Sequence, residues 1–254
     1  MDGTTIQRVT ALVTAGDEPK ALPRLLKSLR KFCPDLAVLV AGPQPARLPR
    51  GVTFVPHDGG VSGARNTLLA RLRTPVFVLL DDRMQLHPES NLEEMVRPVV
   101  DGELDIASGE ITACRKRWLW TRRRPAPSHG TFELTHRELV LRPGHREATD
   151  RYHMCDIVPN FFVARTDKVR LLGGWDELLK RDERAEFFLR AFRQGLRVGY
   201  CPAVNAWRWD GAGKDEPADL TDYAALAVER MGLERMVGFD GAVYASNALV
   251  RRAA

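Results

Sequence analysis

The chain has 254 residues, of which 44% are hydrophobic, and a formal net charge of +5. This length suits one substantial α/β domain, or a domain with a small appendage. No apolar run approaches the ~20 residues that span a bilayer, and the polar first residues contain no signal-peptide core. We therefore expect a cytoplasmic protein without a transmembrane segment. A charge this mild does not indicate nucleic-acid binding.

The spacing of the cysteines and the ratio of arginine to lysine bear on metal sites, disulfides and the source of the protein. Cys33, Cys114, Cys155 and Cys201 are scattered without CxxC spacing. This spacing fits neither a zinc site nor a disulfide framework and favours buried free thiols. Arginine far outnumbers lysine, which favours a GC-rich bacterial source.

The first part of the chain predicts alternating strands and helices. Residues 9–14, 37–41 and 52–55 read as strands, and the apolar spacing of residues 22–32 predicts an amphipathic helix. Because the links are short, we expect a parallel sheet with right-handed crossovers.

A buried strand that ends in two carboxylates is the centre of the predicted site. Residues 75–80 form an apolar run introduced by proline, and Asp81 and Asp82 follow it. In an open α/β sheet, ligands bind outside the carboxyl ends of the strands. The helix predicted before this strand, over residues 64–72, carries Arg65 near its N-terminus. That position suits a phosphate, although a plain surface arginine is an equal alternative.

The second part is less regular between residues 112 and 155. The remaining predictions are helices over 92–99, 182–194 and 220–232, strands over 104–108, 158–165 and 197–200, and a hairpin of 131–134 with 138–141. Residues 115–124 combine six basic residues with Trp118 and Trp120. This stretch fits an acidic or lipid-linked partner, a loop that closes over a diphosphate, or a solvated basic loop.

The ordered motifs of the chain carry a family resemblance over roughly residues 8–210. The series VTALVTAGDEP, GVSGARN and VFVLLDD resembles a family 2 glycosyltransferase with the GT-A fold. The later stretches NFFVARTDKVRLLGGWDE, AEFF and GLRVGYCPAV are similar to the catalytic domain of β-1,4-N-acetylgalactosaminyltransferases, as is SLRKFCPDLAVLVAG.

The resemblance implies an α/β fold: a single GT-A domain with a mainly parallel central sheet, flanking helices and a small antiparallel insertion. We expect residues 8–110 to bind the nucleotide and residues 111–240 to shape the acceptor side. The implied reaction is an inverting transfer of a hexosyl or N-acetylhexosaminyl group from a nucleotide sugar, typically a UDP-sugar, to a small-molecule or glycan acceptor. The leaving diphosphate must then be neutralised and the acceptor hydroxyl or amine deprotonated.

The sequence departs from the family at the metal site. The D-x-D motif that usually holds a divalent metal reads Asp81-Asp82-Arg83 here, and the position of a later metal-site histidine is Arg208. Arg83 and Arg208 could replace the metal and clamp the diphosphate, because guanidinium groups pair well with phosphate oxygens. The alternatives are a metal (Mn or Mg) bound with the help of Asp82, and a weak or inactive enzyme.

The general base is ambiguous. Glu186 matches the family's AEFF glutamate, whereas spacing from Gly195 points to Glu183 and puts Arg184 on the acid of the wider Glu-Asp motif. We predict Glu186 first and Glu183 second. A surface ion pair of Glu186 with Arg190, four residues on, is the alternative.

The remaining site predictions divide between donor and acceptor. Residues expected to line the donor pocket are Thr14, Glu18, Arg65, Asp81, Asp82, Arg83 and Arg208. Residues expected on the acceptor side are Asn160 and Trp175, although Trp175 also fits a core role. Two other classes stay open: a nucleotidyltransferase, for which no Gly-rich loop is found, and a non-catalytic sugar-nucleotide-binding protein.

Overall fold

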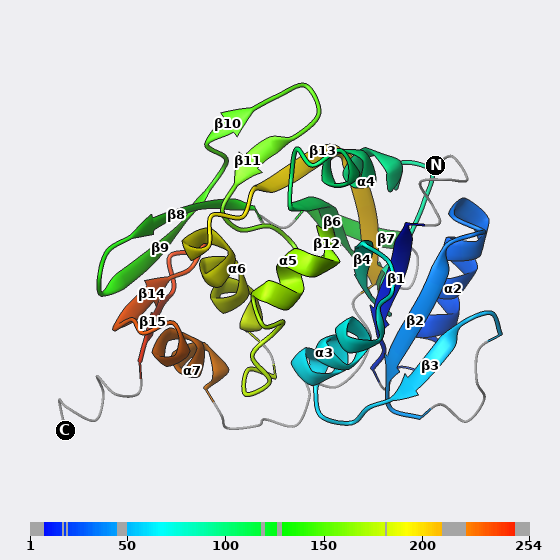
Figure 1. Ribbon diagram of the computed structural model, residues 1–254, viewed down its shortest axis with the longest axis horizontal. Coiled ribbons are helices and arrows are strands. Elements are labelled where there is room, and N and C mark those ends of the chain that lie inside the picture. The colour runs from blue at the N-terminus through cyan, green and yellow to red at the C-terminus, as the bar shows by residue number, and fades with distance from the viewer. Residues whose placement is uncertain are drawn as a thin grey trace.

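The computed structural model describes residues 8–246 except 17, 19, 45–49, 118–119, 126–128, 181 and 210–221, and only the backbone of the remaining residues of 116–128. A large central sheet takes strands from both parts of the chain, with helices packed against it and a smaller sheet beside it (Figure 1). No described helix combines the length and apolar character that crossing a membrane requires.

The nucleotide-side part follows the predicted alternation. Its elements are β1 (Val9–Thr14), α2 (Ala21–Phe32), β2 (Ala37–Gly42), β3 (Thr53–Pro56), α3 (Val61–Arg71) and β4 (Val76–Asp81). The four strands lie in the parallel order β4-β1-β2-β3. The predicted strands and helices are confirmed, because each is a local apolar pattern with a short link to the next.

The later strands return into the same sheet. The elements are β5 (Met84–Gln85), α4 (Glu93–Val100), β6 (Ile106–Arg117), β7 (Trp120–Pro125), β12 (Phe162–Arg165), α5 (Thr166–Leu171), α6 (Glu183–Arg193) and β13 (Val198–Trp209). Strand β12 runs antiparallel between β4 and β6, and β13 lies parallel to β6. The predicted α/β class is confirmed, but the central sheet is mixed rather than mainly parallel, because β12, β7 and β5 all pair antiparallel with their neighbours.

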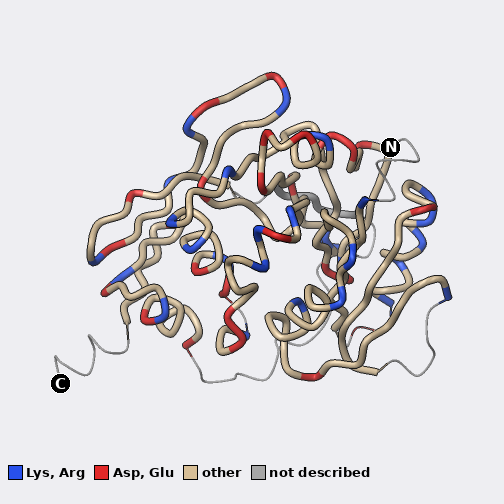
Figure 2. The backbone as a smooth tube through the Cα atoms, in the orientation of Figure 1, with Lys and Arg blue, Asp and Glu red and all other residues tan. Residues whose placement is uncertain are grey.

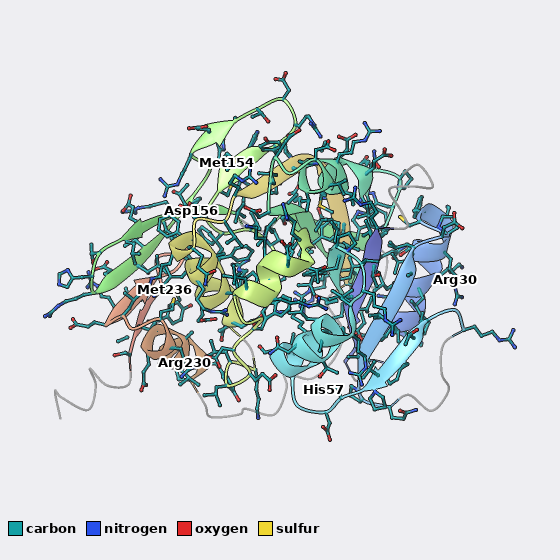
Figure 3. All side chains as sticks on the ribbon, viewed as in Figure 1. Arg30, His57, Met154, Asp156, Arg230 and Met236 are labelled. Atoms are coloured by element: carbon teal, nitrogen blue, oxygen red, sulfur yellow. The ribbon has the colours of Figure 1, made fainter. Side chains whose placement is uncertain are left out.

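The predicted hairpin belongs to a separate four-stranded sheet. Its members are β8 (Gly130–Leu134), β9 (Glu138–Pro143), β14 (Arg235–Val237) and β15 (Val243–Ala245), next to α7 (Tyr223–Arg230). Short strands β10 (Glu147–Ala148) and β11 (His153–Cys155) extend the central sheet. Asp156, labelled in Figure 3, joins the two sheets: it accepts a hydrogen bond from the Phe132 amide at 2.7 Å and pairs with Arg146 at 2.6 Å.

Apolar side chains cover both faces of the central sheet. Phe77, Leu79 and Phe162 pack towards α3, α5 and α6, and Val78, Leu80 and Val163 pack towards α2 and α4. All four cysteines are buried and free, as predicted. Basic and acidic residues are interspersed along the described chain (Figure 2), which agrees with the modest net charge.

The basic stretch differs from the predicted loop. Its backbone forms an antiparallel ladder in which β7 pairs with the end of β6, with Arg115 opposite Arg122 and Arg117 opposite Trp120. Strand β6 is therefore 12 residues long, although the sequence predicted a strand over 104–108 only. A run of basic residues gives little apolar pattern, so the pattern ends before the strand does.

Candidate functional site

The carboxyl ends of β1 and β4 bring the first predicted donor residues together. Thr14 is buried and stands opposite Asp81 in the parallel ladder, and the Asp82 amide donates to the Thr14 carbonyl at 3.1 Å. The Gly16 amide, in the turn after β1, donates to Asp82 Oδ2 at 2.7 Å. Adjacent parallel strands thus place Thr14, Asp81 and Asp82 at one edge of the sheet, as the sequence predicted.

Asp82 has an unusual charge environment. Its side chain is almost fully buried, and this burial raises its pKa to about 6. The hydrogen bond from Gly16 and the charge of Arg83 act in the opposite direction, whereas Asp81 and Glu18 raise the pKa further. Asp82 therefore carries less negative charge near neutral pH than a solvated aspartate does.

Asp81 is paired with an arginine from the far end of the chain. Arg208, on β13, donates from Nε to Asp81 Oδ2 at 3.1 Å, and the Arg83 amide donates to Asp81 Oδ1 at 2.8 Å. The short pairing of β5 with β13, in which Arg208 stands opposite Met84, brings these segments together. In the described part of the chain, no carboxylate forms an ion pair with the half-buried Arg83 guanidinium. Arg208 through its side chain and Arg83 through its backbone amide therefore contact the same carboxylate, and the charge of Arg83 acts on the adjacent Asp82.

A second cluster joins residues predicted for three different roles. Arg65 of α3 forms a buried ion pair with Glu183 at the start of α6, and Asn160 Nδ2 donates to Glu183 Oε1 at 3.0 Å. The Arg65 guanidinium carbon lies 5.5 Å from the ring centroid of Trp175, which is 2% exposed. The surface-arginine alternative for Arg65 is wrong. Among the described residues, Arg65 Nε has no hydrogen-bond partner.

Glu186 lies one turn further along α6 and is held by an arginine. Its Oε1 and Oε2 accept hydrogen bonds from Arg190 Nε at 2.5 Å and Nη2 at 2.8 Å, and both Glu186 and Glu183 are buried. Arg190 also donates to the Leu172 carbonyl at 2.6 Å. The ion pair of Glu186 with Arg190, offered from the sequence as the alternative role, is therefore present. It is not a plain surface pair, because its glutamate is buried. The assignment of Glu186 as base stays a prediction.

The two clusters share one edge of the sheet. In the antiparallel pairing of β4 with β12, Phe162 stands opposite Leu79. Asn160 and Asp81 each lie two residues beyond that pair, so both reach the carboxyl edge of β4. Glu18 is half-buried in the turn after β1 and acts electrostatically on Asp82. The predicted donor residues and Asn160 thus lie on segments that meet at, or pack over, this edge. Trp175 is instead buried in the core, where its ring stacks on Phe187 with centroids 5.1 Å apart, so the predicted acceptor role is wrong and the core role weighed from the sequence is confirmed.

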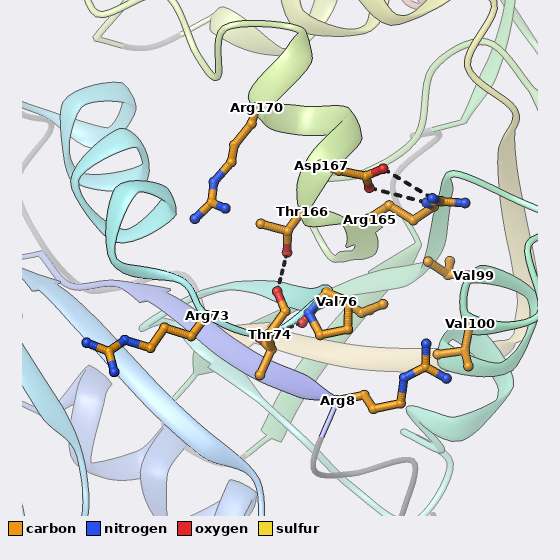
Figure 4. Close-up of a pocket in the computed structure, with 11 residues that line it drawn as sticks. Arg8, Arg73, Thr74, Val76, Val99, Val100, Arg165, Thr166, Asp167 and Arg170 are labelled. Carbon is orange, nitrogen blue, oxygen red and sulfur yellow. Dashed lines mark hydrogen bonds and ion pairs between the residues drawn. The ribbon is translucent and has the colours of Figure 1, made fainter.

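A basic hollow of about 420 Å³ lies at the other end of the sheet. It is lined by Arg8, Arg73, Arg165 and Arg170, together with polar and apolar residues at the start of β4. The side chains of Arg8 and Arg73 extend to opposite sides of it, and Arg165 pairs with Asp167 (Figure 4). Because these guanidinium groups diverge or already have partners, and no predicted site residue lines the hollow, we do not assign the donor to it.

The comparisons with known proteins agree with the fold and the motifs. Residues 44–172 match the family model described as Glycosyl transferase family 2. Human β-1,4 N-acetylgalactosaminyltransferase 1 is 30% identical over 258 residues, covering 91% of this chain and 47% of that protein. Mouse β-1,4 N-acetylgalactosaminyltransferase 2 is 28% identical over 196 residues, covering 73% of this chain and 36% of that protein. The chain therefore spans less than half the length of these relatives.

Solved structures share the fold at low identity. GalNAc-T7, crystallised with UDP, GalNAc and Mn²⁺, has a TM-score of 0.63 at 14% identity over 87% of this chain and 47% of that one. Residues 1–349 of S. aureus TarS, in complex with UDP-GlcNAc, have a TM-score of 0.60 at 14% identity over 88% of this chain and 66% of that one. The fold is that of the GT-A glycosyltransferases. The chain belongs to glycosyl transferase family 2, and the predicted resemblance is confirmed.

Proposed function

We propose that this domain transfers a hexosyl or N-acetylhexosaminyl group from a UDP-sugar to a hydroxyl or amine of a glycan or small-molecule acceptor, with inversion at the anomeric carbon. Family membership supports the reaction class. The names of the relatives support an N-acetylhexosamine, and the UDP and UDP-GlcNAc in the structures of similar fold support a UDP donor. The domain is most simply a single unit, because its central sheet takes strands from both parts of the chain.

The donor is proposed to lie at the carboxyl edge of β1 and β4. Thr14, Glu18, Asp81 and Asp82 would line its pocket, whereas Arg65, buried in its ion pair with Glu183, would support the pocket from α3. As the bond between the anomeric carbon and the diphosphate breaks, negative charge develops on the leaving oxygen. Fixed positive groups aimed at that oxygen lower the barrier, because they need no reorganisation during the reaction.

The residues present do not fit a divalent metal well. Asp81 is engaged by Arg208, Asp82 is buried with a raised pKa, and two guanidinium groups stand where the family has metal-site residues. A group of like-charged arginines repels a metal ion but attracts a diphosphate. We therefore assign neutralisation of the leaving group to Arg83 and Arg208, and the ion pair of Arg208 with Asp81, two residues before Arg83, is the observation that carries the proposal.

The acceptor is proposed to be acidic or lipid-linked. The basic β6–β7 ladder continues beside β13, where Ala113 stands opposite Arg208 and Cys114 opposite Trp209. Basic residues of 115–124 therefore belong to a segment next to the proposed diphosphate site. An acidic acceptor predicts a KM that rises with ionic strength, because salt screens exposed charges.

UDP release from UDP-GlcNAc and UDP-GalNAc, with and without EDTA, tests the arginine assignment. Arg83→Ala and Arg208→Ala are expected to lower kcat/KM about 100-fold or more, the scale of losing one transition-state donor. Arg165→Ala is the matched control, because Arg165 also pairs with an aspartate at 3.1 Å but lies at the opposite end of the sheet. EDTA should leave the wild-type rate unchanged.

Three other outcomes would contradict parts of this assignment. A rate that collapses in EDTA and returns with Mn²⁺ would favour a metal site that uses Asp82. Thermal stabilisation by UDP without turnover would favour a binding protein, and pyrophosphate release from a nucleoside triphosphate would favour a nucleotidyltransferase. Inversion is checked separately by the NMR coupling constant of the anomeric proton in the product.

A further inference from the structure

Arg184 follows Glu183 in the first turn of α6 and carries a positive charge without a partner. Its side chain is half-buried, and in the described part of the chain no residue accepts a hydrogen bond from its guanidinium group or forms an ion pair with it. The guanidinium carbon lies 5.9 Å from the ring centroid of Phe239, a contact that offers no hydrogen-bond acceptor. The N–H donors of Arg184 are therefore available to a ligand.

The surroundings of Arg184 make an unpaired cation unfavourable. Burial lowers the pKa of its guanidinium group, although Glu183 and Asp182 act in the opposite direction. The helix dipole also disfavours a cation in the first turn. Glu183 does not pair with Arg184, because it is bound by Arg65 and Asn160. A charge held in this way without compensation is costly, and a bound anion would remove that cost.

Arg184 faces the central sheet near the proposed site. Residues four apart on a helix lie on the same face, and Phe188 packs edge-on against Phe162 of β12, with ring centroids 6.0 Å apart. Arg184 is one turn closer to the start of α6, where Glu183 meets Asn160. Arg184 therefore lies over the end of β12 that reaches the carboxyl edge of β4.

Aromatic rings from the acceptor-side part of the chain lie next to Arg184. A Cβ atom at Gly130 would lie 2.6 Å from the ring of Phe239, which contacts Arg184. The residue before it, His129, stacks on Tyr200 of β13 with ring centroids 3.8 Å apart. Binding sites for small ligands combine aromatic surfaces with a few placed polar groups. The guanidinium group thus lies between such a surface and the ion-paired cluster at the start of α6.

We propose that Arg184 binds an anionic group of the acceptor saccharide, a carboxylate or a phosphate, beside the hydroxyl or amine that receives the sugar. A guanidinium group offers parallel N–H donors that match the oxygens of either anion. The neighbouring Glu183 does not prevent this, because its charge is paired with Arg65. The inference rests on the proposed function, names the charged group of its acceptor, and leaves the predicted base, Glu186 or Glu183, as it stands.

Matched acceptors test whether the charge is recognised. UDP release from UDP-GlcNAc and UDP-GalNAc would be measured with methyl hexosides, the corresponding methyl hexuronides and the corresponding 6-phosphates. We expect the wild-type kcat/KM for a charged acceptor to exceed that for its neutral counterpart by about 10- to 100-fold, the scale of a hydrogen bond to a charged group. A preference for hexuronides alone would identify the group as a carboxylate, and one for 6-phosphates alone as a phosphate.

Arg184→Gln should remove this preference. Its kcat/KM for charged acceptors should fall by about 10- to 100-fold, whereas neutral acceptors, UDP affinity and the melting temperature should be unaffected. Arg184→Lys should retain part of the preference, because lysine keeps the charge but not the planar set of donors. Arg193→Gln is the matched control, since Arg193 is exposed in the last turn of the same helix and donates to the Met231 carbonyl at 3.1 Å.

The outcomes separate the inference from the proposed function. Equal turnover of charged and neutral acceptors by the wild type, or a preference that survives in Arg184→Gln, would overturn the inference and leave the glycosyltransferase proposal intact. So would equal losses with charged and neutral acceptors in Arg184→Gln, because Arg184 would then serve the donor site or the fold. A wild-type protein that releases no UDP from any donor would instead contradict the proposed function itself.

Discussion

Asp82 shows how burial sets the charge of a single residue at the donor edge. Its folded-state pKa of about 6 lies above the ordinary value of 3.8, so its ionisation opposes folding. This penalty is absent below the ordinary pKa and complete above the raised one. A difference of about two units corresponds to about 3 kcal/mol.

Asp82→Asn should therefore stabilise the protein at alkaline but not at acidic pH. The amide keeps an oxygen for the Gly16 N–H group and removes the buried charge. We expect a gain of about 2–3 kcal/mol near pH 8 that shrinks towards pH 4, measured by urea unfolding in EDTA. Equal stability of both proteins across this range would contradict the account.

The Arg65–Glu183 pair makes a different prediction at the same scale. Both side chains are at most 7% exposed, so removing one charge leaves the other buried and uncompensated. Glu183→Gln should cost about 3–5 kcal/mol in the free energy of unfolding, with Glu229→Gln as an exposed control. A loss below about 1 kcal/mol would mean that the pair is not held as described.

At the scale of elements, the sequence predicted those helices and strands that are set by local apolar patterns. The parallel direction of β1, β2, β3 and β4 could be predicted because each strand is a local apolar run and helices α2 and α3 supply two of the crossovers; their order in the sheet was not predicted. The lengths of β6 and β13 could not be predicted, since β6 ends in basic residues and β13 has a register shift between Tyr200 and Asn205. The helix predicted over 182–194 begins one residue later, at Glu183, because Asp182 has a left-handed backbone conformation.

The close approach of β2 to the turn after β1 gives a prediction for an element junction. A Cβ atom at Gly42 would lie 2.3 Å from the Ala15 carbonyl oxygen, whereas one at Gly16 would have its nearest neighbour, Asp82 Oδ2, at 3.8 Å. Gly42→Ala should therefore destabilise the protein by about 1–3 kcal/mol, the scale of overpacking. Gly16→Ala is the matched control for thermal unfolding. Equal melting temperatures of the two variants would show that the backbone shifts to admit the methyl group at Gly42 without loss of stability.

For the whole molecule, the sequence predicted the class of site better than its geometry. The resemblance identified Asp81, Asp82, Arg83 and Arg208 as one site although Arg208 is far from the other three in the chain. The insertion of β12 between β4 and β6 was not predicted, because it is a long-range pairing that no local pattern reports. The cytoplasmic location and bacterial source stay predictions.

The central claim is that a nucleotide diphosphate binds at the carboxyl edge of β1 and β4 beside Arg83 and Arg208. A crystal structure of the protein soaked with UDP and EDTA tests it most directly. We expect both guanidinium groups to lie within hydrogen-bond distance of the phosphate oxygens. UDP bound elsewhere, or phosphates that touch neither arginine, would contradict the account.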